Sequence, residues 1–410
     1  MKIPADKFPA LHKAALTFPA IDNHAHPLLR EQNRNDFPYE GVISEASGKA
    51  LKDAPHTLAC FRAIPQLAKL LDLPETATWD DVKAARSTCN YQDLCEKSFK
   101  DSAIQTMLID DDLDDHGVIH DIAWHDQFLK DASRRIVRVE VLAEQILREL
   151  LEPHLMTDTL NVVPILADFT TALRAALIRH AKDPNVAGFK SIVCYRTGLD
   201  VSMYSSQAGL KFSLLDVFKM LQMENKIRLA HKDLNDLVVR TTLDIAGEFQ
   251  KPVQFHTGLG DSDINLIFSS PARLQQVIKN YSRTIFVLLH SSYPYSREAG
   301  YLASVYPNVY LDFGEVFPLV SLQGQKSILH QLLELTPTTK LLWSTDGHYW
   351  PENYYLANLQ SREVIYEVLG EIIEAGNLTE AETVTIVENV LFHTSNTLYG
   401  LGLTPWDGTS

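Results

Sequence analysis

Eight short apolar runs recur along the chain, and each is followed by a stretch with a helical pattern. The runs are rich in β-branched and aromatic residues, which is typical of buried parallel strands. They span residues 18–26, 103–110, 135–142, 186–195, 252–258, 284–292, 308–314 and 340–347. A strand followed by a helix, repeated eight times, is the unit of a (β/α)₈ barrel, so the pattern predicts a TIM-like α/β barrel.

The spaces between the runs carry helix signals. The segment 170–184 ends in Asp-Pro, which marks a helix stop, and 214–251 is long enough for one or two helices. Thr379 and Glu382 are spaced as in a capping box at the start of the C-terminal helical region. A doubly wound open sheet is the alternative, but no glycine-rich phosphate-binding turn follows any of the runs.

No glycine-, serine- or proline-rich linker divides the chain, so we expect residues 1–410 to form a single barrel. The first two runs are separated by an oversized segment, residues 32–102, that contains helical patterns. An insertion after the first strand lies at the C-terminal face of a barrel, where active sites are built. We therefore expect a helical insertion that covers the site or forms part of a lid.

Polar side chains follow the apolar runs. His24 and His26 are two residues apart at the end of the first run, so both point to the same face of a strand and can reach one metal ion. His256, His290 and Asp346 each close a later run and open a polar loop. Because the C-terminal ends of barrel strands meet at one face, this set predicts a metal site.

The segments GFKSIVCYRTGLD, FHTGLGDSD, HSSYPYSREAGYLA and WSTDGHYWPE carry a family resemblance together with the HxH pair. The chain resembles the amidohydrolase superfamily, in its amidohydrolase-related branch. It is similar to the amidohydrolase domain that is fused to a glutamine-synthetase-like domain in fungal developmental and plant nodulin-type proteins. The resemblance implies that His24, His26, His256, His290 and Asp346 bind one or two divalent metal ions, with zinc expected.

Lys190 lies in the fourth run, where some members of the superfamily have a lysine that is carboxylated and bridges two metals. Other members of the branch use one metal and no bridging lysine. Lys190 could instead be an ammonium that orients a substrate carboxylate, or a structural lysine paired with an acid. The sequence alone does not decide between these roles of Lys190.

The amino-acid composition limits the classes of binding partner that we expect. There are 37 lysines and arginines against 52 aspartates and glutamates, a net charge of −15, which disfavours nucleic acid and anionic membrane surfaces. Four cysteines without a CxxC pair suggest reduced thiols. The N-terminus lacks a secretory pattern and no run is long enough to span a bilayer, so we expect a cytoplasmic protein. Its oligomeric state is left open, a homo-oligomer included.

Together these features predict a metal-dependent hydrolase that cleaves an amide or other C–N bond of a small, carboxylate-bearing substrate with a metal-activated water. Asp346 would move the proton, and His290 would bind a second metal or contact the reacting oxygen. Substrate contacts are expected from residues in the loops after the strands, namely Tyr195, Arg196, Tyr293, Arg297 and His348, while Glu315 is expected to act through other residues at most. The alternatives are a decarboxylase or isomerase of the same superfamily, or a non-catalytic regulatory barrel.

Overall fold

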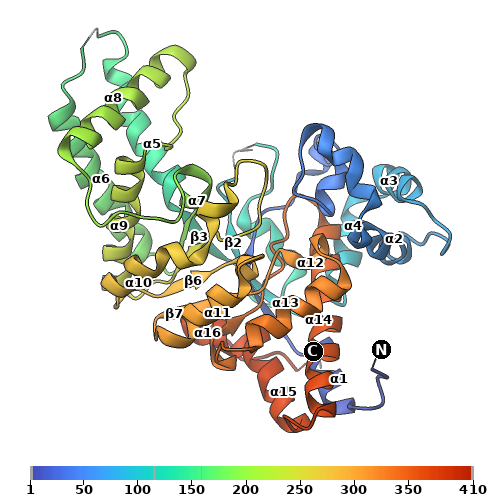
Figure 1. Ribbon diagram of the computed structural model, residues 1–410. Helices are drawn as coiled ribbons and strands as arrows, with labels where there is room; N and C mark the ends of the chain where they lie inside the picture. Colours follow the sequence, from blue (N-terminus) through green and yellow to red (C-terminus); the bar gives the residue numbers. More distant parts are fainter. Residues whose placement is uncertain (1–2, 114–116, 158, 408–410) are drawn as a thin grey trace.

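Eight parallel strands follow one another in sequence order around the centre of the computed structural model, which describes residues 3–113, 117–157 and 159–407 (Figure 1). The strands are β1 (Ala20–Ala25), β2 (Ile104–Asp110), β3 (Arg134–Arg138), β4 (Val186–Ser191), β5 (Val253–Phe255), β6 (Phe286–Leu288), β7 (Val309–Asp312) and β8 (Leu341–Leu342). Backbone hydrogen bonds between β1 and the β8 segment bring the ends of the sheet together, with Asn23 N donating to Trp343 O at 3.2 Å and Asp346 N to His24 O at 3.0 Å. The fold is a (β/α)₈ barrel, as the sequence predicts.

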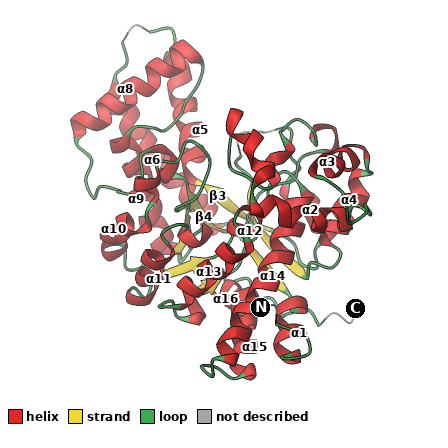
Figure 2. Ribbon diagram, turned by 45° about the vertical axis from the view of Figure 1, so that its right-hand side comes forward, coloured by secondary structure: helices red, strands yellow, loops and turns green. Residues whose placement is uncertain are grey.

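Helices surround the strands on the outside of the barrel (Figure 2). After α1 (Pro9–Thr17), they are α5 (Val139–Leu151), α6 (Val162–Lys182), α7 (Val193–Arg196), α8 (Gln207–Glu224), α9 (Lys232–Phe249), α10 (Gln275–Asn280), α11 (Ser296–Val305), α12 (Val316–Leu319), α13 (Leu322–Leu333), α14 (Pro351–Glu374), α15 (Glu380–Glu388) and α16 (Thr394–Leu398). The segment 214–251 holds two helices because Asn225, in a left-handed conformation, ends α8. The capping box of Thr379 and Glu382 is present at the start of α15.

In two of the apolar runs the strand changes into an α-helix before the run ends. The run 135–142 changes to helix at Val139, where α5 begins, and the run 186–195 changes at Val193, where α7 begins. Both segments remain buried across the change. A continuous buried run does not distinguish a strand from the first turn of a buried helix, so the sequence pattern could not show these boundaries.

One end of the barrel interior is filled. Apolar side chains from β1 to β8, Ile21 and Val287 among them, form a cluster with Phe392 and Tyr399 from the C-terminal region. The Tyr399 hydroxyl donates to Asn23 Oδ1 at 3.2 Å and accepts a hydrogen bond from Gln254 Nε2 at 2.8 Å, so its polar end is satisfied inside the barrel. The opposite, C-terminal end of the strands carries the side chains that the sequence predicts for the site.

The long segment between β1 and β2 is helical, with α2 (Leu58–Leu70), α3 (Trp79–Thr88), α4 (Tyr91–Phe99) and the 3₁₀ turns Glu31–Asn33, Tyr39–Val42 and Gly48–His56. Its buried side chains form a hydrophobic cluster of their own, which includes Trp350 and Leu356 of the α14 region. Figures 1 and 2 show α2–α4 on one side of the strands and α5, α6, α8 and α9 on another. A contact between Ser47 Oγ and Ser262 Oγ at 3.2 Å joins this segment to the loop after β5. Its role as a lid stays a prediction.

Within the residues that the structure describes, no helix combines the length and the apolar character needed to cross a membrane.

Candidate metal centre

The paired histidines of β1 lie at the end of the barrel interior. His24 is fully buried and His26 is nearly so. A hydrogen bond of 2.8 Å between Nδ1 of His26 and the backbone oxygen of Asp110 fixes the imidazole ring. The other ring nitrogen, Nε2, takes no part in this hydrogen bond. This nitrogen lies 3.6 Å from Asp346 Oδ1, and Nε2 of His24 lies 3.3 Å from the same oxygen. Both imidazoles therefore face one carboxylate.

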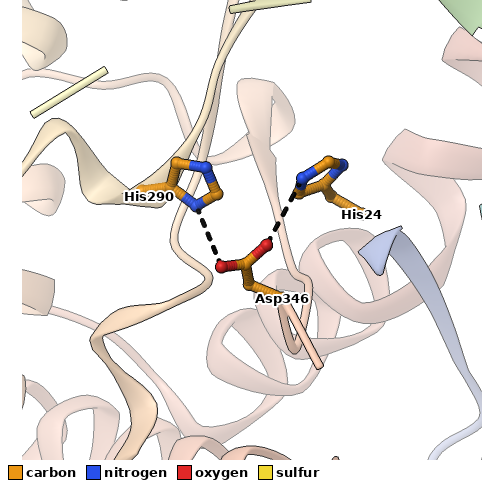
Figure 3. Close-up of side chains that lie close together, drawn as sticks. All are labelled: His24, His290 and Asp346. Carbon is orange, nitrogen blue, oxygen red and sulfur yellow. Dashed lines mark ion pairs between the residues drawn. The ribbon is translucent and has the colours of Figure 1, made fainter. Parts of the chain in front are cut away.

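Asp346 lies between imidazoles that come from different strands (Figure 3). Its Oδ1 faces His24, and its Oδ2 is 3.8 Å from Nδ1 of His290. One ligand atom from each of His24, His290 and Asp346 falls within 4.8 Å of the others, and all three residues are buried. This is the arrangement that a single divalent cation requires of a protein with imidazole and carboxylate ligands.

A second group of potential ligands shares His290. It contains His256, which follows β5, and Glu315, which follows β7, and the ligand atoms again lie within 4.8 Å of one another. Glu315 Oε2 is 3.3 Å from His290 Nδ1, and the rings of His256 and His290 are 4.2 Å apart between centroids. The sequence analysis expects Glu315 to act only through other residues, whereas in the structure its carboxylate lies directly against the His290 ring.

The backbone holds these side chains in unusual conformations. His290, Glu315 and Asp346 have φ values of 66°, 58° and 52°, in the left-handed region that non-glycine residues seldom adopt. Asp312 accepts hydrogen bonds from the backbone N–H groups of His290 at 3.3 Å and of Gly314 at 2.9 Å. A backbone strained at three ligand positions and held by a buried carboxylate is consistent with a functional site.

A second buried aspartate supports the loop that carries Asp346. Asp22 Oδ1 accepts a hydrogen bond from Thr345 N at 2.9 Å, and its Oδ2 accepts one from the Thr345 hydroxyl. The Thr345 hydroxyl oxygen in turn accepts from Gly347 N at 2.9 Å. Residues on both sides of Asp346 are thereby fixed to β1, the strand that supplies the two histidines.

Burial keeps the imidazoles neutral. It lowers the pKa of His26 to about 3 and holds the pKa values of His24, His256 and His290 well below their usual range. A neutral imidazole has the lone pair that a metal ion needs. Burial also raises the pKa of Asp346 well above its ordinary value, and it does the same for Glu315, where the neighbouring Asp346 adds repulsion. A bound cation would stabilise the ionised form of both carboxylates.

Lys190 projects from β4 into the same region. It is 1% exposed, and its Nζ lies 2.8 Å from Nε2 of His24. Burial lowers the pKa of this lysine. The contact with His24 brings the Lys190 amine next to the histidines that the sequence predicts as ligands, and its role as a bridging ligand stays a prediction.

The residues present fit a divalent cation. Among the described residues, several buried polar atoms here have no hydrogen-bond partner: His24 Nδ1, both ring nitrogens of His290, Asp346 Oδ1 and Glu315 Oε2. Leaving such atoms unsatisfied is costly, about 1–3 kcal/mol for each group. Neutral imidazoles and carboxylates that converge without other partners are the donors that zinc and similar ions prefer.

A cavity of 490 Å³ opens above these ligands. His26, Lys190, His256, Glu315 and Asp346 contribute to its lining, and so do three residues that the sequence assigns to substrate contacts, Tyr195, Arg196 and His348. The cavity is also lined by residues that the sequence analysis did not identify: Glu45, Leu113, Arg138, Ile192, Arg228, Asp261, Asp263 and Tyr349. Its size suits a small molecule, and its walls carry charges of both signs.

Comparison with known proteins identifies the family of the chain. A family model described as amidohydrolase matches residues 160–382, more than half of the chain. The chain belongs to the amidohydrolase family. Protein fluG of Emericella nidulans is 43% identical to this chain over 408 residues, an alignment that covers 95% of this chain and 46% of fluG. This chain therefore spans about half the length of that curated relative.

Solved structures share the fold of this amidohydrolase. A protein from Lactobacillus casei whose name describes it as a metal-dependent hydrolase superposes with a TM-score of 0.77 at 24% identity, covering 94% of this chain and 96% of its own. Uronate isomerases from Bacillus halodurans and Thermotoga maritima both give a TM-score of 0.64, at 15% and 14% identity. They cover 98% and 97% of this chain, and 97% and 100% of their own. At these identities the likeness concerns the fold alone.

The structure does not bring two of the expected substrate contacts to the cavity of the amidohydrolase. Tyr293 does not line it and packs against the main hydrophobic core. Arg297 lies in the first turn of α11, on the outer surface, where its Nε and Nη2 both bond to Glu334 at 2.9 Å. The expected role of Arg297 is corrected for this reason: α11 begins at Ser296 and carries the guanidinium away from the strand ends.

Proposed function

We propose that this amidohydrolase is a metal-dependent hydrolase of an amide or other C–N bond in a small, carboxylate-bearing molecule. The observation that carries the proposal is the convergence of His24, His290 and Asp346, with unpartnered buried atoms, beneath a cavity of 490 Å³. A cavity whose polar side chains converge at one point is the expected form of a small-molecule active site.

His24, His26 and Asp346 would hold the ion, with His290 beside them. When bound, such an ion activates water at neutral pH and polarises a carbonyl oxygen. The protein's contribution is to fix the ligands beforehand: His26 is oriented by the Asp110 carbonyl and Asp346 by the loop that Asp22 holds. Ligands that are already in place need little reorganisation during the reaction.

Asp346 would also transfer the proton. Its Oδ1 faces His24 and His26, which suits the ligand position, while Oδ2 points toward His290. The oxygen on the His290 side would accept the proton of the attacking water and deliver it to the leaving nitrogen. His290, with a neutral ring, would hydrogen-bond the oxygen on which negative charge develops.

Arg196 would bind the substrate carboxylate. Its side chain is 10% exposed and lines the cavity, yet its carboxylate partner, Glu144 Oε1, lies 3.8 Å from Nη2. The Nε of Arg196 has no hydrogen-bond partner among the described residues. A guanidinium that lines a cavity is suited to two parallel hydrogen bonds with a carboxylate.

Product analysis tests the reaction. The protein, loaded with zinc, is incubated with a panel of N-acyl amino acids and ω-amides of dicarboxylic amino acids, and released amine, carbon dioxide and isomerised products are measured separately. We expect amine release that depends on the metal and is lost on chelation. Carbon dioxide or an isomer without amine would replace the hydrolase by one of the alternative reactions.

A further inference from the structure

The outer face of α8 carries apolar side chains that are exposed to solvent. Phe212 is 68% exposed, Leu215 36% and Met223 82%. Helix positions that are three, seven and eleven residues apart lie on one face, so these side chains form a single stripe along the helix. Lys219 lies on the same stripe and is exposed. Single exposed apolar side chains are ordinary on a protein surface, whereas several that share one face are typical of an interaction surface.

The opposite face of α8 is packed within the chain. Leu210, Leu214, Val217, Phe218 and Leu221 are buried on that side, and the helix contacts α6 and α9. Figures 1 and 2 show α8 at the outer edge of the group formed by α5, α6, α8 and α9, away from the strands. The buried face thus holds the helix in place, and the exposed stripe is not needed for packing within the chain.

Another exposed apolar side chain lies beside the last turns of α8. Gln222 Nε2 donates to the backbone oxygens of Leu155 at 3.0 Å and of Thr157 at 3.4 Å, which holds this segment against the helix. Met156, the residue between them, is 97% exposed. Methionine adapts its shape to a partner and is frequent at binding surfaces. The apolar surface is therefore wider than the stripe at this end of α8.

The charges on the stripe are self-complementary. Asp216 lies on the same face as Lys219, and its carboxylate is 45% exposed although Oδ2 contacts His231 Nε2 at 2.8 Å. When two α8 helices pair antiparallel about the point between residues 217 and 218, Lys219 of each copy faces Asp216 of the other. The same pairing sets Phe212 of each copy opposite Met223 of the other. A two-fold interface requires this match of a surface with itself.

We propose that two copies of this chain associate through the exposed stripe of α8, with the two helices antiparallel. The stripe carries one positive and one negative charge, so the contact can form although each chain has a net charge of −15. Two helices about 27 Å long present a smaller surface than a standard interface of about 1,600 Å². We therefore expect a dimer that dissociates on dilution.

Sedimentation velocity over a wide range of protein concentration measures the association. We expect the wild type to change from monomer to dimer as the concentration rises. Phe212→Glu and Met223→Glu each bring a charge into the apolar contact and should raise the Kd at least about tenfold. Phe61→Glu makes the same exchange at an aromatic side chain of α2 that is 56% exposed, and it should leave the Kd unchanged. Circular dichroism of each variant checks the fold.

Introduced cysteines test the antiparallel orientation. Phe212→Cys and Met223→Cys chains are mixed in equal amounts and treated with a short thiol crosslinker, and peptide mass spectrometry identifies the joined positions. We expect links between unlike chains, because like chains would hold their introduced thiols about 16 Å apart along the helix axes. The wild type, treated in the same way, is the control for the four native cysteines.

A charge exchange tests the register of the two helices. Lys219→Asp and Asp216→Lys each set like charges opposite one another in their own dimers, so the Kd should rise about fivefold in each. An equal mixture of the two variants restores both pairs of opposite charge and should associate more tightly than either variant alone. Asp216→Lys also loses the contact with His231, so its thermal midpoint is measured on the same sample.

The results decide on the interface and leave the proposed function to its own test. A wild type that stays monomeric at every concentration would overturn the proposal, and so would a dimer that persists in Phe212→Glu and Met223→Glu. Links between like chains would overturn the antiparallel orientation. A mixture no tighter than its components would overturn the register. None of the substituted residues lines the cavity, so zinc binding and turnover can be lost or kept independently of the dimer.

Discussion

The floor and the rim of the cavity differ in how the chain builds them. At the floor, His24, His290 and Asp346 come from strand ends and are buried. The backbone N–H of His290 donates to Asp312, and that of Thr345, the residue before Asp346, donates to Asp22. At the rim, Arg228 and Asp263 form an ion pair at 2.7 Å with side chains that are 44% and 54% exposed. Such an exposed pair contributes little to stability, about 0–1 kcal/mol. The floor is thus built for fixed geometry, whereas this exposed pair at the rim can change with little cost to the fold.

The largest effect is expected from removing ligands at the floor. The double variant His24→Ala, His26→Ala should lose nearly all metal from this site, because too few ligands remain to hold an ion. Metal analysis after desalting measures this loss. Circular dichroism of the same sample shows whether the barrel remains folded. Full occupancy in the folded double variant would refute the assignment of the paired histidines.

The next effect concerns proton transfer at Asp346. Asp346→Asn keeps the shape and one metal-binding oxygen but removes the basic oxygen, so turnover should fall by ~10²–10⁴, the usual contribution of a positioned general base. Asp261→Asn removes a carboxylate from the cavity lining away from the ligand groups and should change turnover far less. Kinetics and metal content are measured together on both variants. Near-normal turnover in Asp346→Asn would leave the reaction without its base.

The contrast between floor and rim also explains what could be predicted from the sequence. The sequence predicts ligands at positions that close apolar runs, because parallel strands bring such positions to one face; these are His24, His26, His256, His290 and Asp346. Glu315 also directly follows an apolar run, 308–314, but the sequence does not show what its side chain contacts, and only the fold shows how close it lies to His290.

The sequence analysis did not identify several residues that line the cavity, and each omission has a physical reason. Arg138 is the last residue of β3, but the apolar run continues into α5, so the end of the strand was hidden. Glu45, Asp261 and Arg228 lie on loops, whose paths no periodicity describes. Arg297 was placed at the site by its nearness in sequence to His290, whereas the start of α11 turns it outward.

A smaller effect, on zinc affinity, should follow from weakening the hydrogen bonds that hold the loops at the floor. Asp312→Asn weakens the acceptor for the N–H groups of His290 and Gly314, so the ligands at these loops should be held less firmly. Losing such a supporting group typically costs 10–100-fold in metal affinity or activity. Competition with a chromophoric chelator measures zinc affinity. Asp233→Asn, which removes a carboxylate from the α8–α9 region, is the matched control and should leave affinity unchanged. Equal affinities for the two variants would show that Asp312 supports the fold alone.

The smallest effect is expected at the rim, and it tests whether the rim selects the substrate. Arg196→Lys keeps the positive charge but loses the planar fork that binds a carboxylate through two hydrogen bonds. We expect KM to rise by about tenfold, since a hydrogen bond to a charged group is worth about 1.5–3 kcal/mol, with kcat and bound zinc little changed. Arg297→Lys makes the same exchange on the outer surface, where the guanidinium pairs with Glu334, and should leave KM as it is. KM is also measured for a substrate and for its carboxamide analogue, because Arg196→Lys should raise KM for the carboxylate form alone. An equal penalty on both forms would mean that Arg196 shapes the cavity without recognising the carboxylate, and a loss of zinc in Arg196→Lys would mean that the rim and the floor are not independent.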